Sequence, residues 1–187
     1  QGQRSGVPEN LRRLTEELIA QVESLAQPLA TLNWLAQQAE NSLKSPRLTE
    51  NQRLWPALKA LIQQFASEGL LTEQDDGLHF KDEAARFFVN GGWLEAYTYS
   101  LVYGLRSEIP KIQDVGRSVE LCRDCTGKAV KNELDVAFLY NNHLYIIECK
   151  TKRFIAPNEL EAQSSDFDSH GADALYKLDT LKWLLGV

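Results

Sequence analysis

Three acidic residues and a lysine fall at one end of an otherwise apolar stretch, residues 132–151, which reads NELDVAFLYNNHLYIIECKT. Two runs rich in β-branched and aromatic residues flank Asn141 and Asn142. Two consecutive asparagines favour the tight turn of a β-hairpin, because Asn tolerates the positive φ that this turn requires. A two-residue turn pairs Tyr140 with His143 and, further along the strands, places the charged residues together: Glu133, Asp135, Glu148 and Lys150.

Alternation along the strands separates this hairpin into two faces. One face is apolar and is expected to form core: Leu134, Val136, Phe138, Tyr145, Ile147 and Cys149. The other face is apolar in the middle, with Ala137, Leu139, Leu144 and Ile146, and charged only at the end that carries the acids.

Asp135 opposite Glu148 would repel across the strands unless a cation lay between them. Both offer the hard oxygen ligands that Mg²⁺ or Mn²⁺ prefers. Lys150, two residues after Glu148, points the same way and could hold a phosphate or polarise a water. A metal and a lysine around a phosphodiester give metal-assisted hydrolysis. The alternative is a structural network in which Lys150 neutralises the acids.

The pattern of Asp135, followed by Glu148, Cys149 and Lys150 at the end of the next strand, resembles the PD-(D/E)xK restriction-endonuclease-like core. The wider sequence resembles a narrower group, the CRISPR ancillary nucleases that join a CRISPR-associated Rossmann-fold (CARF) sensor domain to a nuclease domain. The stretches that carry this resemblance are GLHFKDEAARFFVNGGWLEAYTYSLVYGL, NELDVAFLYNNHLYIIECKT and ALYKLDTLKWL, and it extends over roughly residues 70–187.

The resemblance implies a metal-dependent endonuclease that hydrolyses phosphodiester bonds of DNA, RNA or both in type III CRISPR antiviral defence. It implies that Asp135 and Glu148 bind Mg²⁺ or Mn²⁺, that Glu95 lies near the metal, and that the backbone carbonyl of Cys149 is a further ligand. It favours Lys177 as a secondary site residue that contacts nucleic acid; the alternative is an exposed lysine on a helix. It also implies a homodimer in the prokaryotic cytoplasm, activated by a cyclic oligoadenylate through a sensor domain that this chain lacks.

Composition is that of a globular protein, with 43% hydrophobic and 25% charged residues among 187. No apolar run approaches a membrane span and no signal peptide opens the chain. Three cysteines without an export signal indicate a reducing cytoplasm. The net charge of −6 argues against a broad nucleic-acid-binding surface. Because the chain starts at Gln1 and has no Met, we expect it to be a piece of a longer protein.

The predicted fold class is mixed α+β in three regions. Residues 1–46 are expected to form a helical connector, with apolar stripes at Leu11, Leu14, Leu18, Val22 and Leu25 and at Leu29, Leu32, Leu35 and Ala39, interrupted by Pro28. Residues 47–90 are expected to form a winged-helix-like module. A capping box at Thr49 and Gln52 starts it, and a helix that ends at Gly69 has an apolar face of Leu58, Leu61, Ile62 and Phe65. A small hairpin through Asp75 and Asp76 follows. Its function is either nucleic-acid contact or packing and dimerisation.

Residues 91–187 are expected to form an αβββα nuclease core whose final strand is missing. Gly91 and Gly92 end a short helix, and the next helix is predicted to bury Leu94, Tyr97, Leu101, Val102 and Leu105. Glu95 lies at the border of that face, from where it reaches a strand packed beneath it, or it is a surface residue favoured by the helix dipole. The first core strand is predicted near residues 118–122.

The remaining candidates are weaker. Cys122 and Cys125 form a lone CxxC without the further ligands of a zinc site, so a structural or incidental role is favoured. Lys152 and Arg153 could contact a nucleic-acid backbone or lie at a solvated strand end. Residues 157–171 are expected to form a loop, in which Asp166, Asp168 and His170 are weak ligand candidates, before a helix with the stripe Leu175, Leu178, Leu181 and Leu185. The competing hypothesis for the whole chain is a module that binds nucleic acid or protein through a catalytically inactive nuclease-like domain.

Overall fold

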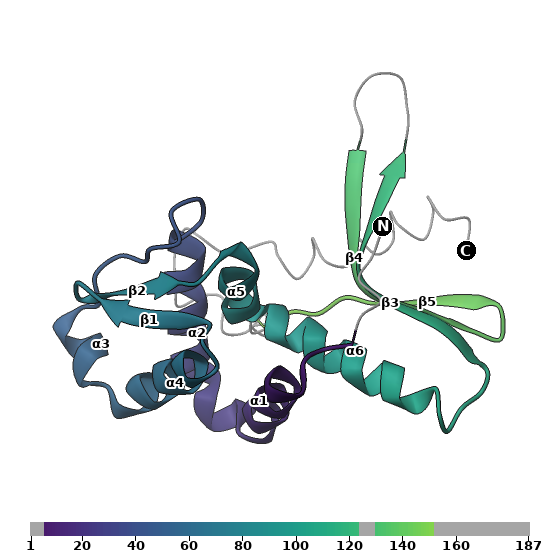
Figure 1. Ribbon diagram of the computed structural model, residues 1–187, viewed down its shortest axis with the longest axis horizontal. Helices are drawn as coiled ribbons and strands as arrows, with labels where there is room; N and C mark the ends of the chain where they lie inside the picture. The colour runs from purple at the N-terminus through teal and green to yellow at the C-terminus, as the bar shows by residue number, and fades with distance from the viewer. Residues whose placement is uncertain (1–5, 124–129, 152–187) are drawn as a thin grey trace, which may run out of the picture.

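Helices dominate the first half of the chain and strands the second half (Figure 1). The computed structural model describes residues 6–123 and 130–151, with side chains for 6–121 and 132–151. The helices are α1 (Glu9–Ala20), α2 (Val22–Gln38), α3 (Glu50–Leu54), α4 (Pro56–Ser67), α5 (Glu83–Phe87) and α6 (Trp93–Leu105), with the π-helical segment η1 (Phe88–Gly92) between α5 and α6. The strands are β1 (Leu71–Gln74), β2 (Gly77–Phe80), β3 (Ile112–Arg123), β4 (Val130–Tyr140) and β5 (His143–Ile147).

The strands form two antiparallel sheets, one of β1 and β2 and one in the order β3-β4-β5. This mixture of helices and antiparallel sheets confirms the predicted fold class. In Figure 1, α6 runs from the helical part of the molecule toward the β3-β4-β5 sheet, and α1 lies alongside it. No helix within the described residues is both long enough and apolar enough to cross a membrane.

Helix α2 continues through Pro28, although the sequence predicted an interruption there. The break between the first two helices lies instead at Gln21. A proline inside a helix costs about 3 kcal/mol because it removes a backbone hydrogen bond. Burial of Pro28 itself, and of Leu29 and Leu32 after it, offsets that cost.

The next segment follows the sequence prediction closely. The Thr49 hydroxyl oxygen accepts from the Gln52 backbone N–H, and the Gln52 side-chain oxygen accepts from the Thr49 backbone N–H. This capping box starts α3. Helix α4 buries the expected face: Leu58, Leu61, Ile62 and Phe65. Asp75 and Asp76 both have positive φ, as a tight hairpin turn requires. The winged-helix-like character of this region stays a prediction.

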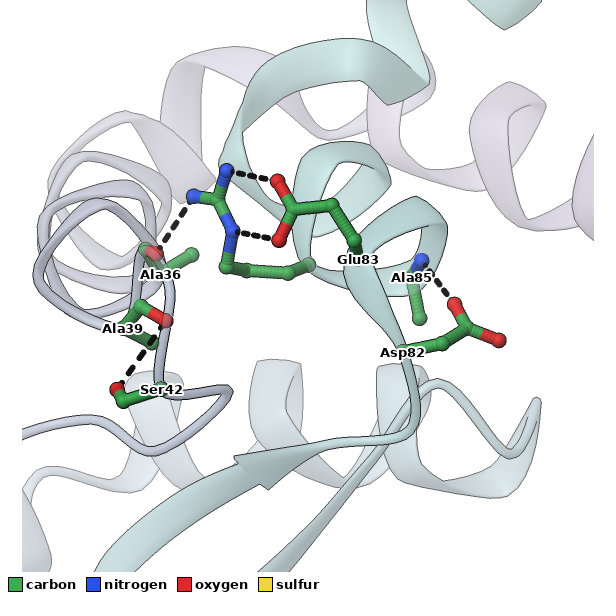
Figure 2. Close-up of polar contacts among 7 residues, drawn as sticks. Ala36, Ala39, Ser42, Asp82, Glu83 and Ala85 are labelled. Atoms are coloured by element: carbon green, nitrogen blue, oxygen red, sulfur yellow. Dashed lines mark hydrogen bonds and ion pairs between the residues drawn. The ribbon is translucent and has the colours of Figure 1, made fainter.

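A single apolar cluster runs from Leu14 on α1 to Ala96 on α6, so it crosses both predicted domain boundaries. Those boundaries remain predictions. Arg86 links two of the helices that form this cluster. Its buried guanidinium donates to the Ala36 carbonyl at 2.9 Å and pairs with both carboxylate oxygens of Glu83; Figure 2 labels Ala36 and Glu83 and draws these bonds as dashed lines. This contact ties the end of α2 to α5.

Helix α6 buries Val102, as predicted, but otherwise a different face from the one predicted. Its buried residues are Trp93, Ala96, Tyr99 and Val102, whereas Leu101 and Leu105 are 51% and 40% exposed. The prediction failed because the helix is apolar on almost every side, so periodicity alone could not choose a face. The small Ala96 lies in the helical cluster, and Tyr99 and Val102 pack on the β3-β4-β5 sheet.

The hairpin of β4 and β5 has the predicted register from Tyr140–His143 to Val136–Ile147, and Asn141 and Asn142 both have positive φ. Strand β3 begins earlier than predicted. Its pairing with β4 passes from Arg117–Val136 directly to Val119–Leu134.

The two strands bend sharply within this stretch (Figure 1), and Ser118 there has a φ of 49°. The bend overturns the prediction that Leu134 shares a face with Val136. Leu134 packs with Ala137 in a separate cluster, while Val136 packs beneath α6.

Candidate active site

The candidate site lies where three elements meet: the bend in β4, the residues just after β5, and the first turn of α6. Asp135 comes from the bend and is 8% exposed. Glu148 and Lys150 follow the end of β5, and Glu95 comes from the first turn of α6. The structure therefore brings together the four residues that the sequence nominated as catalytic.

Asp135 is held by a backbone contact rather than by the predicted strand pairing with Glu148. The regular ladder ends at Val136–Ile147. Beyond it, the Cys149 N–H donates to Asp135 Oδ2 at 2.7 Å. A hydrogen bond from a backbone amide to a buried carboxylate is charge-assisted and therefore strong. It fixes the chain between Glu148 and Lys150 against β4.

Lys150 pairs with Glu148, with Nζ 2.7 Å from Oε1. The Glu148 side chain is 4% exposed and the Lys150 side chain 40% exposed, so the lysine shields the carboxylate from solvent. Burial lowers the pKa of the Lys150 ammonium, but the hydrogen bond and charge of Glu148 raise it by more, so the net pKa is raised. Lys150 is thus protonated at neutral pH, with one side open to solvent.

Glu95 is a half-buried residue whose carboxylate lies near several other acids. Burial is the main cause that raises its pKa to about 7, and the nearby acids Asp135, Glu133 and Glu148 contribute to this shift. Its Oε2 atom is buried and has no hydrogen-bond partner among the described residues. The carboxyl therefore lies between its neutral and ionised forms at neutral pH.

Arg117 is a site residue that the sequence reasoning missed. It lies on β3 opposite Val136, and its positive charge lowers the pKa of Glu95. Burial lowers the pKa of the Arg117 guanidinium, with Glu95 opposing that shift. The guanidinium also lies over the Tyr99 ring, 5.9 Å from its centroid. Extending the predicted strand by one residue would have placed Arg117 beside the acids.

Cys149 contributes its backbone rather than its thiol. Burial raises the pKa of the thiol to about 11, and its Sγ donates to Thr98 Oγ1 at 3.5 Å. The thiol therefore stays protonated and packs in the apolar cluster beneath α6, as the sequence predicted. This contact also holds α6 against the residues that follow β5.

The donor set suits a hard divalent cation. Asp135, Glu148 and Glu95 offer only carboxylate oxygens, the ligands that Mg²⁺ and Mn²⁺ prefer. The unpartnered Glu95 Oε2 is a buried polar atom that a cation would satisfy. Among the described residues, however, no three acidic, histidine or cysteine side chains converge tightly enough to hold one ion without rearrangement.

Several nominated residues lie outside the part of the chain that the structure describes. These are the possible nucleic-acid contacts Lys152, Arg153 and Lys177, the loop residues Asp166, Asp168 and His170, Cys125, and the side chain of Cys122. Their roles stay predictions.

Comparison with known proteins decides the family. The model of the Card1-like endonuclease domain matches residues 82–187. The chain belongs to the Card1-like endonuclease family. All four nominated catalytic residues, Arg117 and the Thr98 contact lie within the match, and the resemblance drawn from the sequence is confirmed. The match begins at residue 82, before the predicted nuclease boundary at 91.

Two solved structures resemble the chain along almost its whole length. Protein VC1899 from Vibrio cholerae has a TM-score of 0.73 at 33% identity, covering 95% of this chain and 44% of that protein. Can2 from Sulfobacillus thermosulfidooxidans, solved in complex with cyclic tetra-adenylate, has a TM-score of 0.67 at 28% identity, covering 94% of this chain and 43% of that protein. This member of the family thus spans less than half the length of either. A search of curated proteins found no match.

Proposed function

We propose that this chain is the metal-dependent nuclease part of a CRISPR ancillary nuclease that hydrolyses phosphodiester bonds of DNA, RNA or both. One observation carries the proposal: Asp135, Glu148 and the partly buried Glu95 are gathered around the protonated Lys150. A protein gains no stability from clustering buried like charges, so such a cluster indicates a functional site. Membership of an endonuclease family supports the same reading.

Asp135 and Glu148 would hold Mg²⁺ or Mn²⁺, with Glu95 and the Cys149 backbone carbonyl as further oxygen ligands. When bound, the metal would lower the pKa of a water and offset negative charge on the phosphate. The chain's own residues supply the rest. Asp135 anchors the backbone between Glu148 and Lys150, and Lys150 presents a partly exposed positive charge to a phosphate oxygen or to the attacking water.

Regulation is proposed by analogy. Can2, of which this chain covers 43%, was solved with cyclic tetra-adenylate, so a cyclic oligoadenylate is the proposed activator of the whole protein. We also propose a homodimer in the prokaryotic cytoplasm. Neither the activator nor the dimer follows from the described residues of this chain.

The experiment that tests the nuclease is cleavage of supercoiled plasmid, single-stranded DNA and single-stranded RNA with Mn²⁺, with and without EDTA. Glu148→Gln and Lys150→Ala are expected to abolish cleavage. Glu73→Gln, on an exposed position of β1 remote from the site, is the matched control and is expected to cleave like the wild type. The same panel should include cyclic tetra-adenylate and any longer protein of which this chain is part.

A second candidate function is a binding module built on an inactive nuclease-like domain. The specific observation in its favour is the Lys150–Glu148 ion pair, which neutralises one acid without any metal. Calorimetry separates the two candidates. The nuclease binds Mn²⁺ and loses that binding in Glu148→Gln, whereas absence of both metal binding and cleavage, in the longer protein too, would overturn the nuclease and favour the binding module.

A further inference from the structure

The Asn33 side chain on α2 bridges the N-terminal helices to the candidate site. Its amide lies 3.0 Å from Thr151 Oγ1. With its nitrogen turned toward the helix backbone, the amide donates to the Leu29 carbonyl at 3.1 Å and to the Val89 carbonyl at 3.0 Å, and its oxygen accepts from the Thr151 hydroxyl. We assign this orientation because it satisfies the donors and the acceptor together. One half-buried side chain thus joins α2, η1 and the residue after Lys150.

Gly91 shapes the other side of the same contact. It has a φ of 108°, a conformation that residues with a Cβ rarely adopt, and it is the last residue but one of η1, just before α6 begins. A Cβ built on Gly91 would lie 2.8 Å from Thr151 Oγ1, well inside van der Waals contact. The Thr151 hydroxyl therefore occupies the space that the missing side chain leaves. The same hydroxyl thus donates to the Asn33 side chain and packs against Gly91.

The two elements joined here carry different halves of the candidate site. Thr151 directly follows Lys150, and Gly91 lies at the kink from which α6 starts, with Glu95 in its first turn. A shift of Thr151 relative to Gly91 would change the position of Lys150 relative to Glu95. Misplacement of reacting groups by about 1 Å can cost up to 10²-fold in rate, so the contact has catalytic consequences.

We propose that Asn33 is a positioning residue. It holds the segment after β5, which carries Lys150, against α6, which carries Glu95, and so couples the orientation of α2 to the candidate active site. The catalytic consequence rests on the proposed nuclease function, but the positioning contact does not. The two are therefore tested by separate measurements.

The first measurement is backbone amide exchange by mass spectrometry or NMR, which needs no activity. In Asn33→Ala and in Thr151→Val, exchange of the amides of residues 148–151 is expected to accelerate by about 10-fold, including the Cys149 N–H that donates to Asp135. Amides of the β1–β2 hairpin should not change, which excludes global unfolding. Asn10→Ala is the matched control, because Asn10 makes an exposed side-chain bond to Glu68, away from the site. Unchanged exchange at 148–151 in both variants would overturn the proposal.

The second measurement is steady-state cleavage, which distinguishes positioning from general destabilisation. Thr151→Val is expected to lower kcat on the order of 10-fold while KM stays within about two-fold, because substrate binding is left intact. Thr151→Ser keeps the hydroxyl and should restore kcat. If the wild type cleaves and Thr151→Val has wild-type kcat, the catalytic part of the inference is wrong. If the wild type cleaves nothing under any condition, the nuclease proposal fails and amide exchange alone decides the contact.

Two glycines with positive φ, Gly91 and Gly69, allow a test of the close packing between Gly91 and Thr151. Gly91→Ala places a methyl against Thr151, whereas at Gly69, with a φ of 69°, nothing lies within 4 Å of the added Cβ. Both substitutions strain the backbone, but only Gly91→Ala is expected to speed exchange at residues 148–151 and to lower kcat. Equal effects of the two variants on these readouts would show that backbone strain, not the contact with Thr151, is responsible.

Discussion

Glu95 is the residue whose surroundings depart most from those of an ordinary surface glutamate. Its carboxyl has a pKa of about 7 against a reference value of 4.5, chiefly because it is buried. The folded state therefore holds this proton more tightly than the unfolded chain does. Between about pH 4.5 and 7 the carboxyl is ionised in the unfolded state but still protonated in the folded state. This group's contribution to the free energy of unfolding therefore falls as pH rises through that window.

Replacing this carboxyl by an amide should remove that dependence. In metal-free buffer, Glu95→Gln is expected to raise the free energy of unfolding at pH 8 by roughly 1–3 kcal/mol and to change it little at pH 4.5. Thermal unfolding followed by circular dichroism between these pH values measures the difference. Glu73→Gln, at an exposed position, is the control. An equal effect of Glu95→Gln at both pH values would show that the carboxyl is not held neutral by burial.

Arg117 and Glu95 should be coupled only while the glutamate is charged. A double-mutant cycle with Arg117→Met and Glu95→Gln is expected to give a favourable coupling of about 1 kcal/mol at pH 8 and almost none at pH 4.5, where Glu95 is neutral. The cycle uses urea unfolding of the wild type, both single variants and the double variant. A coupling that is the same at both pH values would mean that Arg117 acts through packing on Tyr99 rather than through charge.

At the scale of elements, the bend at Ser118 makes the site possible. A φ of 49° is rare for a serine, and in mid-strand it interrupts the flat ladder at the point opposite Asp135. Asp135 then accepts its hydrogen bond from Cys149 beyond the end of β5. A straight strand would keep the period of two and would point Leu134 toward α6.

Substitution at Ser118 should reveal the strain in this bend. Ser118→Val is expected to lower the free energy of unfolding by about 1–2 kcal/mol, because β-branched residues are disfavoured at positive φ, whereas Ser118→Gly should be close to neutral. Urea unfolding gives both values. If valine were tolerated as well as glycine, the bend would be set by the packing around it and not by the backbone at Ser118.

The elements also show what a sequence can and cannot predict here. The β4–β5 register could be predicted from Asn141 and Asn142, because a two-residue turn allows only one register. The capping box at Thr49 and the buried face of α4 are equally local, and both were predicted correctly. The errors concern positions where distant packing decides. Leu101 and Leu105 are exposed because tertiary contacts select another face of α6. Pro28 stays helical because burial of Pro28 and of the leucines after it offsets its cost.

The candidate site divides in the same way. Asp135, Glu148 and Lys150 could be placed together because one hairpin carries them, and Glu95 because a helix border suggested it. Arg117 could not be found without the bounds of β3, and Asn33 could not be found at all. Its contact with Thr151 joins residues 118 positions apart, and no local pattern encodes it.

At the scale of the whole molecule, the N-terminal helices and the start of the family-matched part share one core, which Arg86 seals at its polar edge. Its side chain is 8% exposed, and it connects the Ala36 carbonyl at the end of α2 with Glu83 on α5. Hydrogen bonds to charged groups contribute about 1.5–3 kcal/mol. The Ala36 carbonyl also accepts from the Ala39 N–H, so it keeps one partner when the arginine is removed. Arg86→Met keeps much of the apolar stem and removes these bonds.

Arg86→Met is therefore expected to lower the free energy of unfolding by roughly 1.5–3 kcal/mol in a single cooperative transition, because the N-terminal helices and the start of the family-matched part share one apolar cluster. Urea unfolding followed by tryptophan fluorescence and by circular dichroism measures it. Arg53→Met, which removes an exposed ion pair to Asp76 at 3.0 Å, is the control and should cost less than about 1 kcal/mol. Two separate transitions in Arg86→Met would contradict the single core and would favour an independent N-terminal module, in which case α2 could not transmit its orientation to Thr151 through a rigid contact.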